Sequence, residues 1–266
     1  MNAEINGIRM AYDVMGSGPA VLLIHGFPLC RRMWQSQAQA FSAAGFQVVV
    51  PDLRGFGESG GGDRPGSMDL FADDLIALMD YLKIERAVVG GMSMGGYILL
   101  NLLSRFPQRI RAACFIVTRA DADDEVGRGK RTHLIGEIEA GNPGAVPAAF
   151  GQVLFADQTV AGRPQLVEEV RGWMSATDPA GLVLGLQAIR DRIDSSPLLP
   201  NLKLPALVIG VRQDKAIPPE KSVYLAEHIA GAEFCVIEGG GHMVNLEQVD
   251  AFNRGMLGFL RRLGDS

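Results

Sequence analysis

Residues 90–97 read GGMSMGGY and follow the apolar run AVV of residues 87–89. Four glycines in eight residues cost backbone entropy and add nothing to a hydrophobic core, so the backbone geometry must require them. Between a strand and a helix, the pattern G-x-S-x-G forms a sharp turn that exposes the serine hydroxyl. Gly91 and Gly95 leave room for such a turn, which makes Ser93 the candidate nucleophile.

Apolar runs along the chain predict the strands of a mostly parallel sheet. They are nearly continuous in aliphatic and β-branched residues, as expected of strands that are buried on both faces. Stretches of helical periodicity separate most of them, which predicts a doubly wound α/β fold. Before the first run, Asn6-Gly7 predicts the turn of an antiparallel hairpin. The six runs are residues 20–26, 47–52, 86–91, 111–117, 205–211 and 233–239.

The alternation of strand and helix is interrupted between residues 120 and 200. This segment has helical pieces, separated by turn signals such as GNPG at 141–144, and no convincing strand. We therefore expect a core made of residues 1–119 and 201–266, with residues 120–200 inserted as a helical cap.

Composition excludes several classes of function. The chain has 266 residues, 47% of them hydrophobic, and a net charge of -5, as in ordinary globular proteins. No basic patch with interleaved aromatic residues indicates a nucleic-acid partner. No apolar run of about 18 residues and no signal-peptide pattern is present, so we expect a cytoplasmic protein without a membrane partner. Metal-ligand clusters and phosphate-binding fingerprints are also absent, so no metal or cofactor is expected. A homo-oligomer remains open.

A serine hydroxyl becomes a nucleophile when a base removes its proton, and histidine is the usual base. Of the four histidines, His133 and His228 lie in helical segments, and His25 ends a strand beside the main-chain turn. His242 differs, because it lies in the glycine-rich loop GGGHM that follows the last strand. There, a side chain can reach across the carboxyl edge of the sheet. His242 is therefore the predicted base.

The base needs an acid to orient it, and two aspartates follow strand runs. Asp214 lies in the loop after residues 205–211, whereas Asp121 follows an earlier run and reaches the same edge of the sheet. The chain order Ser93, Asp214, His242 is the one found in α/β hydrolases, which favours Asp214. Asp121 is the competing candidate.

The chain resembles α/β-hydrolase fold proteins over nearly its full length. The motifs HGFPL and GMSMGG are similar to those of carboxylesterases, cofactor-free haloperoxidase or perhydrolase-like enzymes, and enol-lactonases, which share them. The resemblance implies that the backbone amides of Phe27 and Met94 stabilise the oxyanion of the reaction. The matching segments are LLIHGFPL at 22–29, VPDLRGFGES at 50–59, GMSMGG at 91–96, DKAIPP at 214–219 and GGGHMVNLEQ at 239–248.

Apolar residues of the cap and of the sheet edge are candidates for the walls of the substrate pocket. Such walls fit a small or medium hydrophobic ester, although each residue is equally suited to packing the cap onto the core. Arg119 is a candidate for binding a substrate carboxylate, as a lactonase would need, or for pairing with Asp121. Besides Phe27 and Met94, the pocket candidates are Leu29, Phe150, Leu154, Phe155, Trp173, Met174, Ile217 and Met243.

These features predict a serine hydrolase that cleaves small to medium apolar carboxylic esters through an acyl-enzyme. A small-molecule ester or lactone is the expected partner. An enol-lactonase, a perhydrolase or a carbon-carbon bond hydrolase would use the same three residues. A ligand receptor built on a hydrolase frame is the alternative of another class, in which turnover is slow.

Overall fold

The computed structural model describes residues 1–264, which contain one sheet of eight strands in the order β1-β2-β4-β3-β5-β6-β7-β8. β1 pairs antiparallel with β2, and β2 with β4, while all the other neighbours are parallel. The strands are β1 Asn2–Ile5, β2 Ile8–Met15, β3 Ala20–Ile24, β4 Gln47–Pro51, β5 Ala87–Met92, β6 Ile110–Ile116, β7 Ala206–Val211 and β8 Glu233–Ile237. The predicted α/β fold with an antiparallel hairpin is confirmed.

The hairpin turn and the central strands show why these residues form this sheet. Asn6 and Gly7 both adopt positive φ, at 46° and 79°, as a two-residue hairpin turn requires. Every residue of β5 and β7 is buried, because helices cover both faces of the sheet. The continuous apolar runs in the sequence therefore reflect the burial of these strands on both faces of the sheet.

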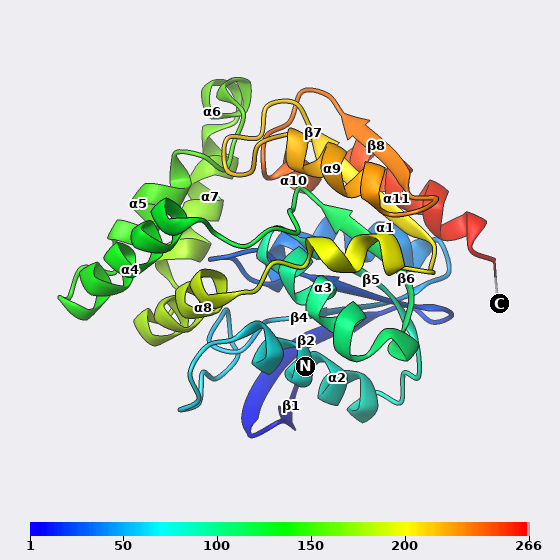
Figure 1. The fold of residues 1–266 in the computed structure, drawn as a ribbon, viewed down its shortest axis with the longest axis horizontal. Coiled ribbons are helices and arrows are strands. Elements are labelled where there is room, and N and C mark those ends of the chain that lie inside the picture. The colour runs from blue at the N-terminus through cyan, green and yellow to red at the C-terminus, as the bar shows by residue number, and fades with distance from the viewer. Residues whose placement is uncertain (265–266) are drawn as a thin grey trace.

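Two layers of helices enclose the sheet (Figure 1). On one face, α2 (Met68–Tyr81), α3 (Met94–Arg105) and α9 (Glu220–His228) contribute to one apolar cluster. On the other face, α1 (Gln35–Ala43) and α11 (Val249–Arg262) contribute to a second one. Alternate strand residues divide between these clusters, since successive side chains of a strand point to opposite faces. Short elements complete these layers: α10 Val244–Glu247 and the 3-10 helices Arg31–Trp34, Pro107–Arg109 and Ser196–Asn201.

Between β6 and β7 the chain forms helices and, among its described residues, no strand. In Figure 1, α4 to α7 gather beyond one end of the sheet. They contact the loops that follow the parallel strands: the ring of Phe150 in α5 lies 5.1 Å from the ring of Phe27, after β3. The helices are α4 Glu125–Glu139, α5 Ala145–Gly151, α6 Asp157–Gly162, α7 Pro164–Ser175 and α8 Pro179–Asp191.

A buried carboxylate ties these helices to the loop after β8. Glu247 accepts hydrogen bonds from the amide of Ala156 at 3.0 Å and from the hydroxyl of Thr159 at 2.6 Å. Its other oxygen accepts the amide of Gly241 at 2.8 Å. One side chain thus holds the start of α6 against the residue that precedes His242. Within residues 1–264, no helix has the length and apolar character that crossing a membrane requires.

Candidate active site

Ser93 lies at a sharp turn between β5 and α3. Its backbone angles are φ 53° and ψ -116°, a conformation that residues other than glycine rarely adopt. A Cβ atom at Gly91 would overlap the carbonyl oxygen of Gly95, and one at Gly95 would overlap that of Ile24. The glycines of the motif are therefore required by the close approach of three backbone segments.

Hydrogen bonds from the end of β6 hold this turn in place. The amide of Ser93 donates to the carbonyl of Ile116 at 3.0 Å, and the hydroxyl of Thr118 donates to the carbonyl of Ser93 at 2.8 Å. The hydroxyl of Ser93 itself has no hydrogen-bond partner among residues 1–264 and lines a cavity. The fold thus fixes the backbone of this serine and leaves its oxygen available.

His242 and Asp214 form a buried hydrogen-bonded pair. The Nδ1 atom of His242 lies 2.8 Å from Oδ2 of Asp214, and the two side chains are 3% and 2% exposed. The other carboxylate oxygen accepts the amides of Ala216 at 2.8 Å and Ile217 at 2.9 Å. Because Nδ1 faces a carboxylate, it carries the proton, and the lone pair of Nε2 remains free. His242 lines the same cavity as Ser93.

Asp121, the competing acid, is bound elsewhere. Its carboxylate accepts hydrogen bonds from Arg119 and, at 3.0 Å, from Lys221. Partial burial raises the pKa of this carboxyl, but the bonds from the two cations outweigh that effect and lower it to about 2. The structure therefore brings Asp214, and not Asp121, into contact with His242.

The remaining histidines are not available as bases for Ser93. In His25, Nδ1 donates to the carbonyl of Gly26 at 2.9 Å and Nε2 accepts the amide of Leu53 at 3.0 Å. Complete burial lowers the pKa of His25, which favours the neutral ring. His133 and His228 are exposed on α4 and α9.

Two backbone N–H groups beside Ser93 have no acceptor within the described part of the chain. They belong to Phe27, in the loop after β3, and to Met94, the first residue of α3. The first amides of a helix lack intrahelical acceptors and lie at the positive end of its dipole. Both residues line the cavity that Ser93 and His242 share.

That cavity is small, with a volume of about 50 Å³. Of the predicted pocket residues, Phe150, Leu154 and Ile217 line it. Further walls come from α3, from the loop after β6 and from the helices between β6 and β7. The complete lining is Phe27, Ser93, Met94, Tyr97, Arg119, Asp123, Arg131, Phe150, Leu154, Ile189, Ala216, Ile217 and His242.

Comparison with known proteins identifies the family of this fold. A family model described as the alpha/beta hydrolase fold matches residues 19–177. The chain belongs to this family. Among solved structures, a thermophilic esterase from Thermogutta terrifontis has a TM-score of 0.95 and 31% identity, covering 99% of this chain and 98% of that one. The enol-lactonase from Burkholderia xenovorans has a TM-score of 0.91 and 29% identity, covering 98% and 100%. A putative carbamate hydrolase from Azorhizobium caulinodans is 30% identical over 93% of each chain.

Other predicted pocket residues of this α/β hydrolase lie outside the cavity. Leu29, Met174 and Met243 are buried in the apolar cluster beside α1 and α11, together with Phe155. Trp173 lines a separate surface hollow with Arg31 and Glu58. The structure does not bring these side chains to the wall that Ser93 lines.

Several residues of the hydrolase cavity were not among the sequence candidates. Tyr97 lies four residues after Ser93, so it falls on the same face of α3, one turn along, and helical spacing alone signals it. Asp123, Arg131 and Ile189 come from the segment between β6 and β7. The sequence carries no signal for which of their faces meets the cavity.

Cations outnumber acids at one wall of the hydrolase cavity. Arg119 and Arg131 line it, and the Arg131 guanidinium lies 5.6 Å from the ring centroid of Phe150. These arginines belong to a cluster in which each of two carboxylates is shared between two cations: Asp121 binds Arg119 and Lys221, and Asp123 binds Arg131 and Arg192. Of its six members, Arg119, Asp123 and Arg131 line the cavity. Four positive and two negative charges give this cluster a net charge of +2. Among residues 1–264, no three His, Cys, Asp or Glu side chains are grouped so as to hold a metal ion.

Proposed function

We propose that this protein is a serine hydrolase of carboxylic esters, in which Ser93 is the nucleophile, His242 the base and Asp214 the acid that orients it. The observation that carries the proposal is the buried 2.8 Å bond between His242 and Asp214 beside the cavity that Ser93 lines. The turn that exposes the serine, and the unused amides of Phe27 and Met94 next to it, support the same chemistry.

The proposed reaction proceeds through an acyl-enzyme. His242 Nε2 removes the proton of Ser93 as the oxygen attacks the ester carbonyl, and Asp214 stabilises the imidazolium that forms. The amides of Phe27 and Met94 donate to the tetrahedral oxyanion, each contributing about 3 kcal/mol to lowering the barrier. His242 then protonates the leaving alcohol. In the second half, His242 removes a proton from water as the water attacks the acyl carbonyl. The bond to the Ser93 oxygen then breaks, His242 returns the proton to Ser93, and the carboxylic acid is released.

We propose that residues 120–200, which include the helices between β6 and β7, form a cap over this site. The core then consists of residues 1–119 and 201–266. This segment supplies Phe150, Leu154 and Ile189 to the cavity, and Glu247 fastens it to the loop that carries His242. A cap of this kind excludes water from the reacting centre, which strengthens the electrostatic interactions inside it.

A second candidate function, hydrolysis of an ester or lactone that carries a carboxylate, is favoured by the arginines at the cavity. The cluster around Arg119 and Arg131 has a net charge of +2, and a substrate carboxylate would offset half of it. The related Thermogutta esterase was solved with malate bound, and another relative is an enol-lactonase.

Chromogenic ester turnover tests the proposed function. We expect wild-type protein to hydrolyse p-nitrophenyl acetate, and the Ser93→Ala variant to lose activity by a factor of about 1,000 or more. A fluorophosphonate probe should label the wild type at Ser93, as located by peptide mass spectrometry. Equal turnover by both proteins, or labelling at another residue, would contradict the assignment of the nucleophile.

A further inference from the structure

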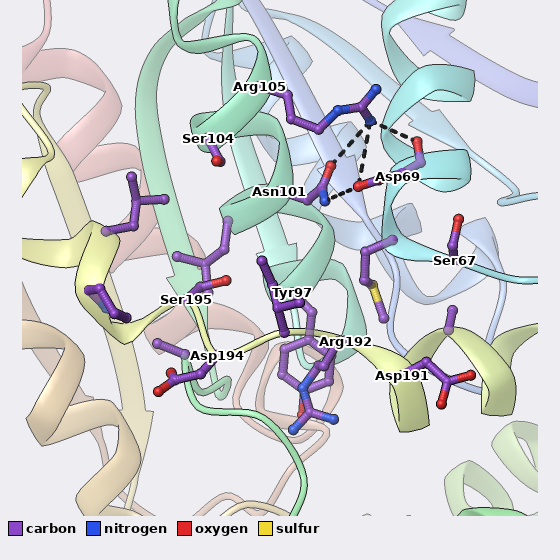
Figure 2. Close-up of a pocket in the computed structure, with 17 residues that line it drawn as sticks. Ser67, Asp69, Tyr97, Asn101, Ser104, Arg105, Asp191, Arg192, Asp194 and Ser195 are labelled. Carbon is purple, nitrogen blue, oxygen red and sulfur yellow. Dashed lines mark hydrogen bonds and ion pairs between the residues drawn. The ribbon is translucent and has the colours of Figure 1, made fainter.

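A second and larger pocket lies beside the candidate active site. It has a volume of about 390 Å³ and is enclosed by the start of α2, one side of α3 and the chain that follows α8 (Figure 2). Its floor is apolar and includes Met68, Leu100 and Ala188, which are all buried. Its rim is polar and includes Asn101 and Ser195, both labelled in Figure 2.

A partition that includes Tyr97 separates this pocket from the cavity that Ser93 lines. Tyr97 lines both spaces. On α8, Ile189 faces the cavity, whereas its neighbour Ala188 faces the pocket. After β6, Arg119 and Ala120 divide between the two spaces in the same way. In both places, adjacent residues therefore lie on opposite sides of the partition, and Tyr97 lines both sides of it.

The polar groups in this partition are incompletely paired. The Arg192 guanidinium lies 4.3 Å from the ring centroid of Tyr97, and Figure 2 shows the two side chains together. The Nη atoms of Arg192 donate to Ile189, Asp121 and Asp123, but its Nε has no partner although the side chain is only 4% exposed. The Tyr97 hydroxyl also has no hydrogen-bond partner within residues 1–264.

An unpaired buried donor such as Nε of Arg192 is costly, and a hydrogen-bond acceptor that entered, as water or on a ligand, would satisfy it. Arg192 lines the larger pocket, so the ligand group would arrive from that side.

The volumes of the two spaces indicate the size of the ligand. Sites for small molecules typically occupy about 300–1,000 Å³, so the cavity of about 50 Å³ beside Ser93 is too small for any but the shortest ester. The neighbouring pocket of about 390 Å³ falls within that range. A substrate that placed its ester at Ser93 and its longer arm in this pocket would use both spaces.

We propose that Tyr97 is a gate between the two spaces, and that the larger pocket binds the apolar arm of a medium-chain ester. This inference rests on the proposed function, because it places the reacting carbonyl at Ser93. Rotation of the Tyr97 ring away from Arg192 opens the partition, and the apolar arm packs against Met68, Leu100 and Ala188. Tyr97 then determines specificity for chain length and takes no part in bond cleavage.

A bulky residue in the larger pocket tests the proposal. The side chain of Ser195 lines the pocket, does not line the cavity and makes no hydrogen bond within residues 1–264. For Ser195→Trp, we expect the ratio of kcat/KM for p-nitrophenyl octanoate to that for the acetate to fall at least tenfold. The matched control is Ser36→Trp, on α1 at the opposite face of the sheet, which should leave the ratio within twofold of wild type.

Removal of the Tyr97 ring is expected to change the octanoate-to-acetate ratio in the opposite direction. Tyr97→Ala should raise the octanoate-to-acetate ratio at least fivefold, and Tyr97→Phe, which keeps the ring, should change it less than threefold. Thermal melting of each variant checks that it is folded. If Ser195→Trp and Tyr97→Ala both retain the wild-type ratio, the larger pocket is not a substrate subsite and the proposal is wrong. Should Ser195→Trp fail to fold, the Tyr97→Ala ratio decides.

A binding measurement separates failure of this proposal from failure of the proposed function. If the wild type hydrolyses no ester, the proposed function fails, and calorimetric titration with octanoate still tests the pocket. We expect octanoate to bind the wild type and Ser36→Trp, with at least tenfold weaker binding to Ser195→Trp. Equal affinities, or no binding to the wild type, would overturn the assignment of the pocket.

Discussion

Asp214 receives three hydrogen bonds, from the imidazole of His242 at 2.8 Å and from the amides of Ala216 and Ile217 at 2.8 and 2.9 Å. The two amides hold one carboxylate oxygen, so the other is aimed at Nδ1 without freedom to rotate. The pair is buried, which means that water does not compete for either partner. The orientation of His242 toward the cavity therefore depends on a carboxylate that the backbone has already positioned.

Asp214→Asn should lower kcat for p-nitrophenyl acetate by a factor of about 1,000–10,000. An amide at this position can donate to Nδ1, which favours the tautomer with the proton on Nε2 and removes the base. The control is Asp121→Asn, which removes a carboxylate bound to Arg119 and Lys221 and should lower kcat less than tenfold. A larger loss of kcat in Asp121→Asn than in Asp214→Asn would reverse the assignment of the acid.

Gly95→Ala should strongly destabilise the protein, because its Cβ would overlap the backbone carbonyl of Ile24. We expect a loss of about 3 kcal/mol or more in the free energy of unfolding, measured by urea denaturation, since the atoms that the new Cβ would meet are backbone atoms of Ile24 and His25 and cannot rotate away. Gly129→Ala provides the comparison: this glycine lies inside α4, and a Cβ there meets nothing. That change should stabilise the protein by up to about 1 kcal/mol. Similar effects of the two changes would mean that the turn is not sterically constrained.

Much of the site geometry could be predicted because local rules determine it. A strand-turn-helix with glycines flanking a serine has one backbone solution, and Ser93 adopts it with φ 53°. The loops after β7 and β8 open at the same edge of the sheet, so Asp214 and His242 could be expected near each other. Chain order already favoured Asp214 over Asp121, but the contacts that occupy Asp121 could be predicted only in part, because Arg119 is two residues away whereas Lys221 is 100 residues away.

The walls of the cavity could be predicted only in part. Phe150, Leu154 and Ile217 line it, whereas Leu29 and Met174 pack into the core. Hydrophobicity indicates that a side chain is buried, but it does not distinguish burial against a substrate from burial against the protein. This ambiguity is largest for the helices between β6 and β7. Their packing depends on contacts such as those of Glu247, and no periodicity in the sequence predicts these contacts.

Stability should fall as the pH drops below about 6.5, in part through His25. Burial lowers the pKa of this histidine in the folded protein, whereas in the unfolded chain it is ordinary. Below about pH 6.5 the unfolded chain therefore binds a proton that the folded protein does not, and the contribution of His25 to stability is lost as pH falls.

Urea denaturation between pH 7.5 and 5 measures this effect. The slope for one proton approaches about 1.4 kcal/mol per pH unit. His25→Gln should have a smaller pH slope than the wild type even if its overall stability is lower, and His133→Gln, at an exposed position, should keep the wild-type slope. Equal slopes in all three proteins would show that His25 is not held neutral in the folded state.

Arg131→Gln should separate charged from neutral substrates. Arg131 lines the cavity and shares Asp123 with Arg192, so its removal takes one positive charge from a cluster with a net charge of +2. We expect kcat/KM for monomethyl succinate to fall at least tenfold, while the value for methyl butyrate changes less than threefold, because only the first ester carries an anion for the guanidinium to bind. Arg128→Gln, on the exposed side of the same helix, is the matched control and should affect neither ester. An equal loss on both esters would mean that Arg131 shapes the cavity without recognising charge.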